Sequence, residues 1–251
     1  MSDKDKDITF EFRIKYKTRD GQNIYIFGDN DDFGNWKNKK FKLDWSDGHI
    51  WKKDYKIQIN NNKLIKYKFV VFDNFSDEVI WEKGPNRILD PNNISGLKIE
   101  NNKFILDLHW ERFSIIFNLY YYKELKDSYM VILGNKNFLG DWKIDRHQDY
   151  NMKLEKDNQD KDVLRKEIIV TLDDNYKHIE ALDCEYKYLI YNYKNNTHTF
   201  EKSDICRHFK ILFDLDKISD ELKFLYLSNK KEYKLLTNSC IEINDENFID
   251  D

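Results

Sequence analysis

The segment LIKYKFVVF, Leu64 to Phe72, alternates polar with aromatic or aliphatic residues, as a β-strand with one buried face does. Lys68 stands between Tyr67 and Phe69, so the alternation predicts its side chain on the opposite, wetter face. Similar segments separated by Asn, Asp or Gly occur along the whole chain: ITFEFRIKY, NIYIFG, WKKDYKIQI, EVIWE, KFILDL, SIIFNLYYY, YMVILG, RKEIIVTL, CEYKYLIY and HFKILF. They predict an all-β fold of two consecutive immunoglobulin-like antiparallel β-sandwiches.

Composition and charge limit the chemical class of the binding partner. The 251 residues include 42 basic and 46 acidic side chains mixed along the chain, a net charge of -4, which excludes the one-sign footprint of a nucleic-acid or membrane-surface binder. Residues 1–10 are charged and lack the apolar stretch of a secretory signal, so we expect a cytoplasmic protein. A neutral partner fits this composition best.

The two halves of the chain repeat the same motifs in the same order. Two pairs are 106 residues apart (134 minus 28 and 142 minus 36): Gly28 with Gly134, and Trp36 with Trp142, in FGNW and FLGDW. Two later pairs are 119 apart (187 minus 68 and 201 minus 82): Lys68 with Lys187, and Glu82 with Glu201. This pattern predicts a duplicated domain, at residues 7–112 and, more divergent, 113–240, followed by an acidic C-terminal tail at 241–251.

Two tryptophans are candidates for contacting a neutral sugar, which offers a face of C–H groups and an edge of hydroxyls. Trp36 follows Gly34 and Asn35, a turn signal, and Trp81 ends a strand before a Gly-Pro turn that carries Asn86. The alternative is that both tryptophans only pack in the core or at its rim. Trp51, inside WKKDYKIQI, is predicted to lie in the core.

The order NIYIFG, FGNW, YKF, VIWEKGPNR and HWER resembles the starch-binding domain, carbohydrate-binding module family 20, over nearly all of residues 8–112. The resemblance implies that Trp36 and Trp81 form an aromatic platform for an α-glucan: starch, amylopectin, glycogen or maltooligosaccharides. It further implies that Lys68, Glu82 and Asn86 hydrogen-bond the sugar hydroxyls.

Two further sites are less complete. Family members often carry a second site, and here Asp20 replaces one of its aromatic residues while Trp45 falls near the other, so Trp45 either binds sugar or packs. In the second half, Trp142, Lys187 and Glu201 match the motif, but Phe200 replaces the strand-end tryptophan and KSDICR replaces KGPNR. We expect either a weaker glucan site at Trp142, Lys187, Phe200 and Glu201 or a purely structural domain.

The sequence lacks a Gly-rich phosphate loop, a nucleophile elbow and a Cys-x-x-Cys motif, and its six histidines form no short metal motif. We therefore expect no catalytic residues, no metal and no cofactor, and a binding protein associated with polyglucan granules. Two alternatives stay open. The chain resembles the paired modules that precede the catalytic domain of cytosolic amylomaltase-like 4-α-glucanotransferases, which implies an accessory region with a glucan-active enzyme as partner. The other alternative is a protein–protein interaction module with vestigial sugar sites.

Overall fold

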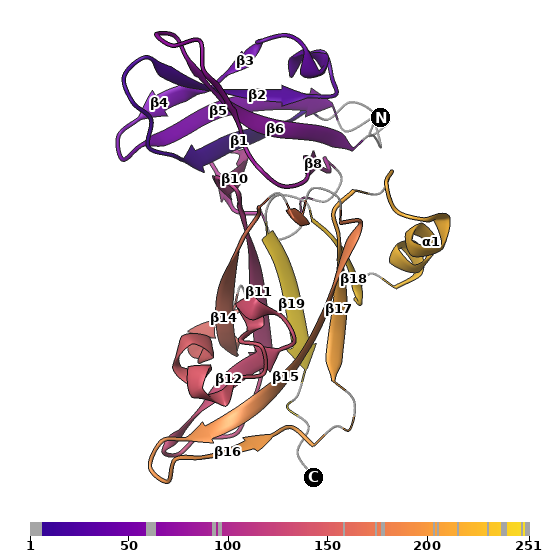
Figure 1. Cartoon of the computed structure of the whole chain (residues 1–251). Helices are drawn as coiled ribbons and strands as arrows, with labels where there is room; N and C mark the ends of the chain where they lie inside the picture. Colours follow the sequence, from indigo (N-terminus) through magenta and orange to yellow (C-terminus); the bar gives the residue numbers. More distant parts are fainter. Residues whose placement is uncertain are drawn as a thin grey trace, which may run out of the picture. The chain divides into compact units, whose positions relative to one another are not determined.

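The computed structural model describes residues 7–58, 64–91, 94, 97–157, 159–173, 175–176, 179–202, 204, 206–214, 216–229, 231–236, 240–246 and 248, and their regular structure is nearly all β (Figure 1). The chain divides into two compact units. Unit 1 comprises Met1–Phe113, Thr171–Ile179 and Leu236–Ser239, and unit 2 comprises Ser114–Val170, Glu180–Leu235 and Cys240–Asp251. The predicted all-β fold class is confirmed.

Unit 1 contains two sheets. In the first, the strand order is β10 (Lys103–His109), β1 (Asp7–Lys15), β5 (Ile50–Gln58) and β4 (Asp44–Ser46), with β9 (Ile99–Glu100) also paired to β10. In the second, the order is β3 (Phe41–Lys42), β2 (Gln22–Gly28), β6 (Ile65–Asp73) and β7 (Val79–Trp81), with β8 (Arg87–Leu89) also paired to β6. Among the described residues of unit 1, these strand pairs are antiparallel except β1 with β10, which is parallel.

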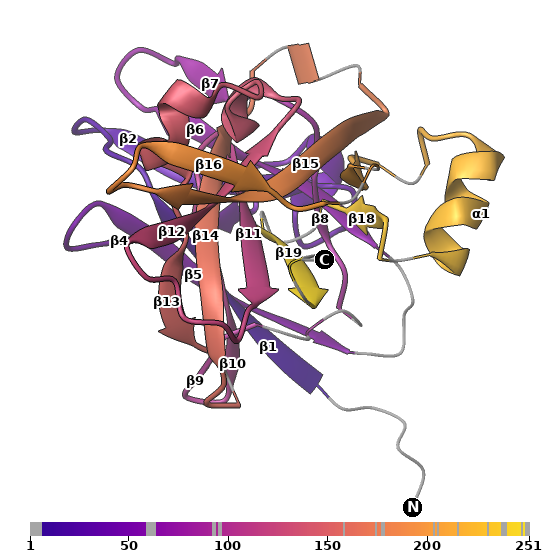
Figure 2. The same ribbon diagram turned by 90° about the horizontal axis from the view of Figure 1, so that it is seen from below.

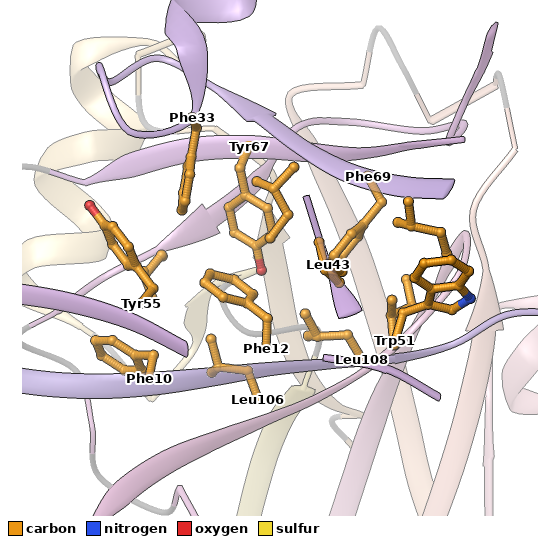
Figure 3. Close-up of a cluster of buried hydrophobic side chains, with 14 of the residues drawn as sticks. Phe10, Phe12, Phe33, Leu43, Trp51, Tyr55, Tyr67, Phe69, Leu106 and Leu108 are labelled. Atoms are coloured by element: carbon orange, nitrogen blue, oxygen red, sulfur yellow. The ribbon is translucent and has the colours of Figure 1, made fainter. Parts of the chain in front are cut away.

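The core of unit 1 lies between these sheets. Figure 3 shows Tyr67 and Phe69 of β6 pointing towards Phe12 of β1 and Leu106 of β10. The rings of Phe12 and Tyr67 meet edge to face at 5.3 Å between centroids. Trp51 is also buried in this cluster, at 4% exposure, which confirms its predicted core position. Burial of each such side chain stabilises the sandwich by ~2 to 3 kcal/mol.

Unit 2 also contains strands of two sheets, most of which are labelled in Figure 2. Its first sheet contains β13 (Lys153–Lys156), β14 (Asp162–Thr171), β11 (Arg112–Tyr120) and β19 (Cys240–Glu246), and its second contains β12 (Ser128–Gly134), β15 (Ala181–Asn192), β17 (Arg207–Leu212) and β18 (Tyr233–Leu235), with β16 (Thr197–Phe200) on β15. Helical elements with both ends among the described residues are η1 (Gly34–Trp36) in unit 1, and η2 (Asn137–Leu139), η3 (Ile144–Tyr150) and α1 (Asp220–Ser228) in unit 2. Within the described ranges, no helix has the length and apolar content needed to cross a membrane.

The strand registers match between the units at the positions that the sequence offsets pair. In unit 1, Phe27 lies opposite Lys68 and Val70 opposite Trp81. In unit 2, Leu133 lies opposite Lys187 and Leu189 opposite Phe200. The second set follows from the first by adding 106 on the early strand and 119 on the later ones.

The prediction of an acidic C-terminal tail was wrong for residues 241–246. These residues belong to β19, which runs parallel to β11, and Ile241, Ile243 and Asp245 are buried while the residues between them are exposed. The segment therefore alternates as a strand does, although its many carboxylates suggested a solvated end. Phe248 is buried as well, and the other residues of the predicted tail lie outside the described residues.

Candidate functional site

Trp81 is a partly exposed ring supported from below by other aromatic side chains. Because Tyr67 and Phe69 point into the core, the residues next to them on β6 face outwards. Trp81 pairs with Val70 on this outer face and remains 42% exposed. Its ring meets Phe27 edge to face at 5.3 Å, and Phe27 stacks on Phe72 at 5.6 Å. These contacts limit the motion of the Trp81 ring, which lowers the entropy lost when a ligand binds.

Trp36 is presented by an unusual turn. Gly34, Asn35 and Trp36 have φ values of 79°, 51° and 60°, all in the left-handed region, which costs ~1 to 2 kcal/mol for a residue other than glycine. Backbone hydrogen bonds compensate, with the Asn35 N–H donating to the carbonyl oxygen of Asn30 at 2.9 Å. Trp36 is partly exposed as a result. The FGNW motif thus suits this left-handed turn, since Gly and Asn adopt positive φ values more readily than other residues.

The same turn occurs in unit 2. Gly140, Asp141 and Trp142 have φ values of 86°, 51° and 60°, and the Trp142 N–H donates to the carbonyl oxygen of Gly134 at 2.9 Å. Trp142 is partly exposed, as Trp36 is. FLGDW therefore folds as FGNW does.

Lys68 fastens the turn that follows Trp81. It lies on the outer face of β6, as the alternation predicts, and its ammonium donates to the carbonyl oxygens of Glu82 at 3.0 Å and Gly84 at 2.7 Å. The resemblance implied a hydrogen bond from Lys68 to a sugar. In the structure, the ammonium holds the residues that follow β7 against β6.

The position of Glu82 differs from the one expected of a sugar ligand. Its side chain is buried, and its carboxylate accepts hydrogen bonds from the Phe69 N–H at 2.9 Å and from the Arg87 guanidinium at 2.9 to 3.0 Å. Burial acts to lower the pKa of Arg87, but the charge and hydrogen bond of Glu82, together with the nearby Tyr67 hydroxyl, outweigh burial, so the pKa is raised. Because neighbouring residues of an extended chain face opposite ways, an outward Trp81 requires an inward Glu82. Glu82 therefore positions the turn from beneath.

Asn86 lies on this anchored turn and is partly exposed. Gly84, two residues earlier, has a φ of 81°, and an added Cβ there would lie 2.8 Å from the Leu172 Cβ, so only glycine fits. Asn86 borders a small hollow together with Pro85, Arg87 and Leu172. The segment from Trp81 to Arg87 is thus held at both ends, by Lys68 and by the Glu82–Arg87 pair.

Trp45, the candidate second site, lies on a different sheet from Trp81. It is 51% exposed on β4, opposite the buried Trp51 on β5, and its ring meets His49 edge to face at 6.5 Å. Asp20 is exposed on a turn. An aromatic surface at Trp45 would therefore be separate from the one at Trp81.

Unit 2 has a similar buried glutamate–arginine pair at the corresponding positions, but Phe200 lies where unit 1 has Trp81. Phe200 is half-buried on β16, and Lys187 is half-buried on β15. Glu201 is buried, and its carboxylate accepts from the Tyr188 N–H at 3.1 Å and from the Arg207 guanidinium at 2.9 to 3.1 Å. Glu201 thus has the position of Glu82, buried and paired with an arginine.

Sequence reasoning missed an aromatic group on the outer face of unit 2, formed by Tyr129, His147, Tyr191 and Tyr193. Tyr191 and Tyr193 are two residues apart in LIYNY, which signals a shared face, but nothing in the sequence pairs them with Tyr129 or His147. Among the described residues, no group of three or more His, Cys, Asp or Glu side chains could hold a metal ion.

Comparison with known proteins gives one family match. The family model described as "Starch binding domain" matches residues 6–97, which lie in unit 1 and include Trp36, Lys68 and Trp81, together with Glu82 and Asn86. The remainder of the chain lies outside this match.

Among solved structures, the chain is similar to a family 15 glucoamylase from Hypocrea jecorina, with 17% identity, a TM-score of 0.34, and coverage of 41% of this chain and 17% of the glucoamylase. It is similar to the family 20 module of a maltotetraose-forming amylase from Pseudomonas saccharophila, with 18% identity, a TM-score of 0.30, and coverage of 40% and 100%. A family 26 module from Eubacterium rectale in complex with maltoheptaose shows 10% identity, a TM-score of 0.28, and coverage of 97% and 94%.

Proposed function

We propose that this chain binds α-glucan polysaccharide, namely starch, amylopectin or glycogen, without catalysing a reaction on it. The match of residues 6–97 to the starch-binding family carries this proposal, because all five predicted ligand positions of unit 1 fall inside it. We further propose that unit 2 is a divergent second starch-binding domain. The shared registers and the repeated left-handed turn support this duplication.

The proposed site works by stacking and by short polar contacts. The C–H face of a glucose ring would lie on Trp81, whose ring is partly exposed and supported by Phe27. Trp36 would supply a second flat surface, and Asn86 has a carboxamide that both donates and accepts hydrogen bonds. Glu82 and Arg87 hold the turn from the inside.

We propose a cytoplasmic location at polyglucan granules, with a glucan-active enzyme as a candidate partner. One observation favours a protein partner. Helix α1 has no buried residue, and Phe224 and Leu227, three residues apart on it, are 68% and 70% exposed. Residues three apart share a helix face, so α1 offers a small apolar contact of the kind that other proteins bind.

Sedimentation with insoluble starch, with soluble β-cyclodextrin as competitor, tests the main proposal. The variants are Trp36→Ala/Trp81→Ala for unit 1 and Trp142→Ala/Phe200→Ala for unit 2. Phe75→Ala is the matched control, because Phe75 is an aromatic residue with 82% exposure outside the proposed site. We expect strong loss in the first variant, smaller loss in the second and none in the control. A wild-type chain that stays in the supernatant would contradict the proposal.

A further inference from the structure

The outer face of unit 2 carries four aromatic rings with nearly parallel planes. Tyr129 of β12 lies opposite Tyr191 of β15, with 5.5 Å between ring centroids and 29° between planes. Tyr193 is 15° from the plane of Tyr129 at 6.4 Å, and His147 of η3 lies over Tyr191 at 3.8 Å and 14°. We call these four residues the Tyr–His cluster. Three separate segments of the chain contribute to it.

Contacts around the cluster keep these rings in place. The Tyr129 hydroxyl is hydrogen-bonded to Nδ1 of His147, and the Tyr191 hydroxyl donates to the side-chain oxygen of Asn196. The backbone N–H of Tyr193 donates to the carbonyl oxygen of Asp127 at 3.1 Å. Tyr191 is buried at 8% exposure, whereas Tyr193 is 60% exposed. The cluster therefore has a fixed base and an open end.

Unit 1 has a different arrangement at the equivalent place. The offset of 119 pairs Tyr191 with Phe72 (191 minus 119), and the Lys39 ammonium lies 4.1 Å from the centre of that ring. The same offset pairs Tyr193 with Asn74, and the offset of 106 pairs Tyr129 with Asn23. Unit 1 therefore covers its ring with a cation and has asparagines where unit 2 has tyrosines. The Tyr–His cluster is a feature of unit 2.

Small polar groups surround the open end of the cluster. Lys194 and Asp127 form a solvent-exposed ion pair at 3.5 Å, and the Asn192 side-chain oxygen accepts from the N–H groups of Lys194 and Asn195. This rim has charges of both signs and several amides. A flat aromatic surface with such a rim suits a neutral ligand that has apolar ring faces and hydroxyl edges.

We propose that the Tyr–His cluster is a sugar-stacking surface of unit 2, at which Tyr193 and Tyr129 contact glucose rings of an α-glucan chain. This inference rests on the proposed function and adds to it residues other than Trp142, Lys187 and Phe200. Tyr193 supplies the exposed ring face. His147 and Tyr191 are positioning residues that support Tyr129.

The test uses the full chain with the unit 1 site removed by Trp36→Ala/Trp81→Ala, and it measures retention on insoluble starch and binding of maltoheptaose. Adding Tyr193→Ala to this background should lower the remaining binding at least five-fold, and Tyr193→Phe should preserve it because the ring face stays. Tyr122→Ala, at a tyrosine with 76% exposure outside the cluster, is the matched control and should have no effect.

Three results would overturn the inference and leave the proposed function intact. The first is a background variant with no remaining binding while the wild type binds. The second is Tyr193→Ala without effect where Phe200→Ala removes the remaining binding. The third is a proline-rich peptide that binds at Tyr193 while maltoheptaose does not. A wild-type chain that binds neither starch nor maltoheptaose would overturn the proposed function and this site together.

Discussion

Each of the two units contains a buried glutamate–arginine ion pair, but the units differ in the aromatic residue that lies on the surface above this pair. Glu82 holds Arg87 and the Phe69 N–H in unit 1, and Glu201 holds Arg207 and the Tyr188 N–H in unit 2. In each unit the guanidinium lies 5.3 Å from the centre of the aromatic ring of that strand residue. The displayed residue is Trp81 in one unit and Phe200 in the other. The two units therefore have the same buried framework beneath different surface residues.

The ion pairs also differ in their other partners. Arg87 donates to the carbonyl oxygen of His109 at 2.6 Å, whereas Arg207 makes a second ion pair with Asp245 at 3.2 Å. Asp245 in turn accepts hydrogen bonds from Tyr186 and Tyr188. The charge of Arg207 is thus shared between two carboxylates, one of them contributed by β19.

The largest predicted effect comes from removing the carboxylate charge in each unit. Glu82→Gln should destabilise unit 1 by ~3 to 5 kcal/mol, because it removes the carboxylate charge that pairs with the buried Arg87 guanidinium. Glu201→Gln should cost less, since Arg207 retains Asp245. Hydrogen exchange measured separately in the two units provides the comparison. Equal losses would mean that Asp245 does not share the charge of Arg207.

A second prediction separates core from platform within unit 1. Trp51→Ala should lower the free energy of unfolding by ~3 to 5 kcal/mol through a core cavity. Trp81→Ala should instead leave unfolding little changed and weaken starch binding by ~2 kcal/mol, about 30-fold, as loss of a central aromatic contact does. Denaturant unfolding and starch sedimentation of both variants give the answer. If Trp81→Ala unfolds the chain and Trp51→Ala spares it, the two roles are reversed.

A third prediction exchanges the displayed residues. Trp81→Phe should weaken starch binding by ~1 kcal/mol, about five-fold, because the ring offers less stacking area. Phe200→Trp, measured in the Trp36→Ala/Trp81→Ala background, should strengthen the remaining binding by a similar factor. Unchanged binding after Phe200→Trp would indicate that the surface of unit 2 at Phe200 is structural only.

The smallest predicted effect concerns acid stability of unit 1. Hydrogen bonds from Arg13 and Lys98 lower the pKa of Glu100 from 4.5 to about 2. A carboxylate with a depressed pKa stabilises the fold above its unfolded value, so this contribution is complete above pH 4.5 and disappears as the pH falls towards 2. Glu100→Gln should therefore flatten the pH dependence of unfolding in that window. An unchanged slope would show that the pairing with Arg13 and Lys98 contributes nothing there.

Several features of the site followed from local sequence pattern. The alternation around Lys68 predicted which residues of β6 face the core. The core position of Trp51 was also predicted, although polar residues follow it in the sequence. FGNW predicted a turn that presents a tryptophan, and the structure adds three successive left-handed residues. These predictions succeeded because the information is contained in neighbouring residues.

Other features required contacts between distant segments. The expectation that Glu82 faces a sugar came from the family motif, but the partner of Glu82 is Arg87 beneath the turn. The segment 241–246 becomes a strand only because β11 offers it an edge for hydrogen bonds. The Tyr–His cluster joins β12, η3 and the end of β15, which lie far apart in the chain.

The sequence alone thus determined the β class, the alternating faces of the strands, the repeated order of the motifs and the resemblance of residues 8–112 to a starch-binding domain. Tertiary structure decided which carboxylates are buried, what the Lys68 ammonium holds, and which aromatic rings of unit 2 come together. The physical reason is range. Side-chain alternation and turn preferences arise between adjacent residues, whereas ion pairing and ring stacking depend on which strands become neighbours in the folded chain.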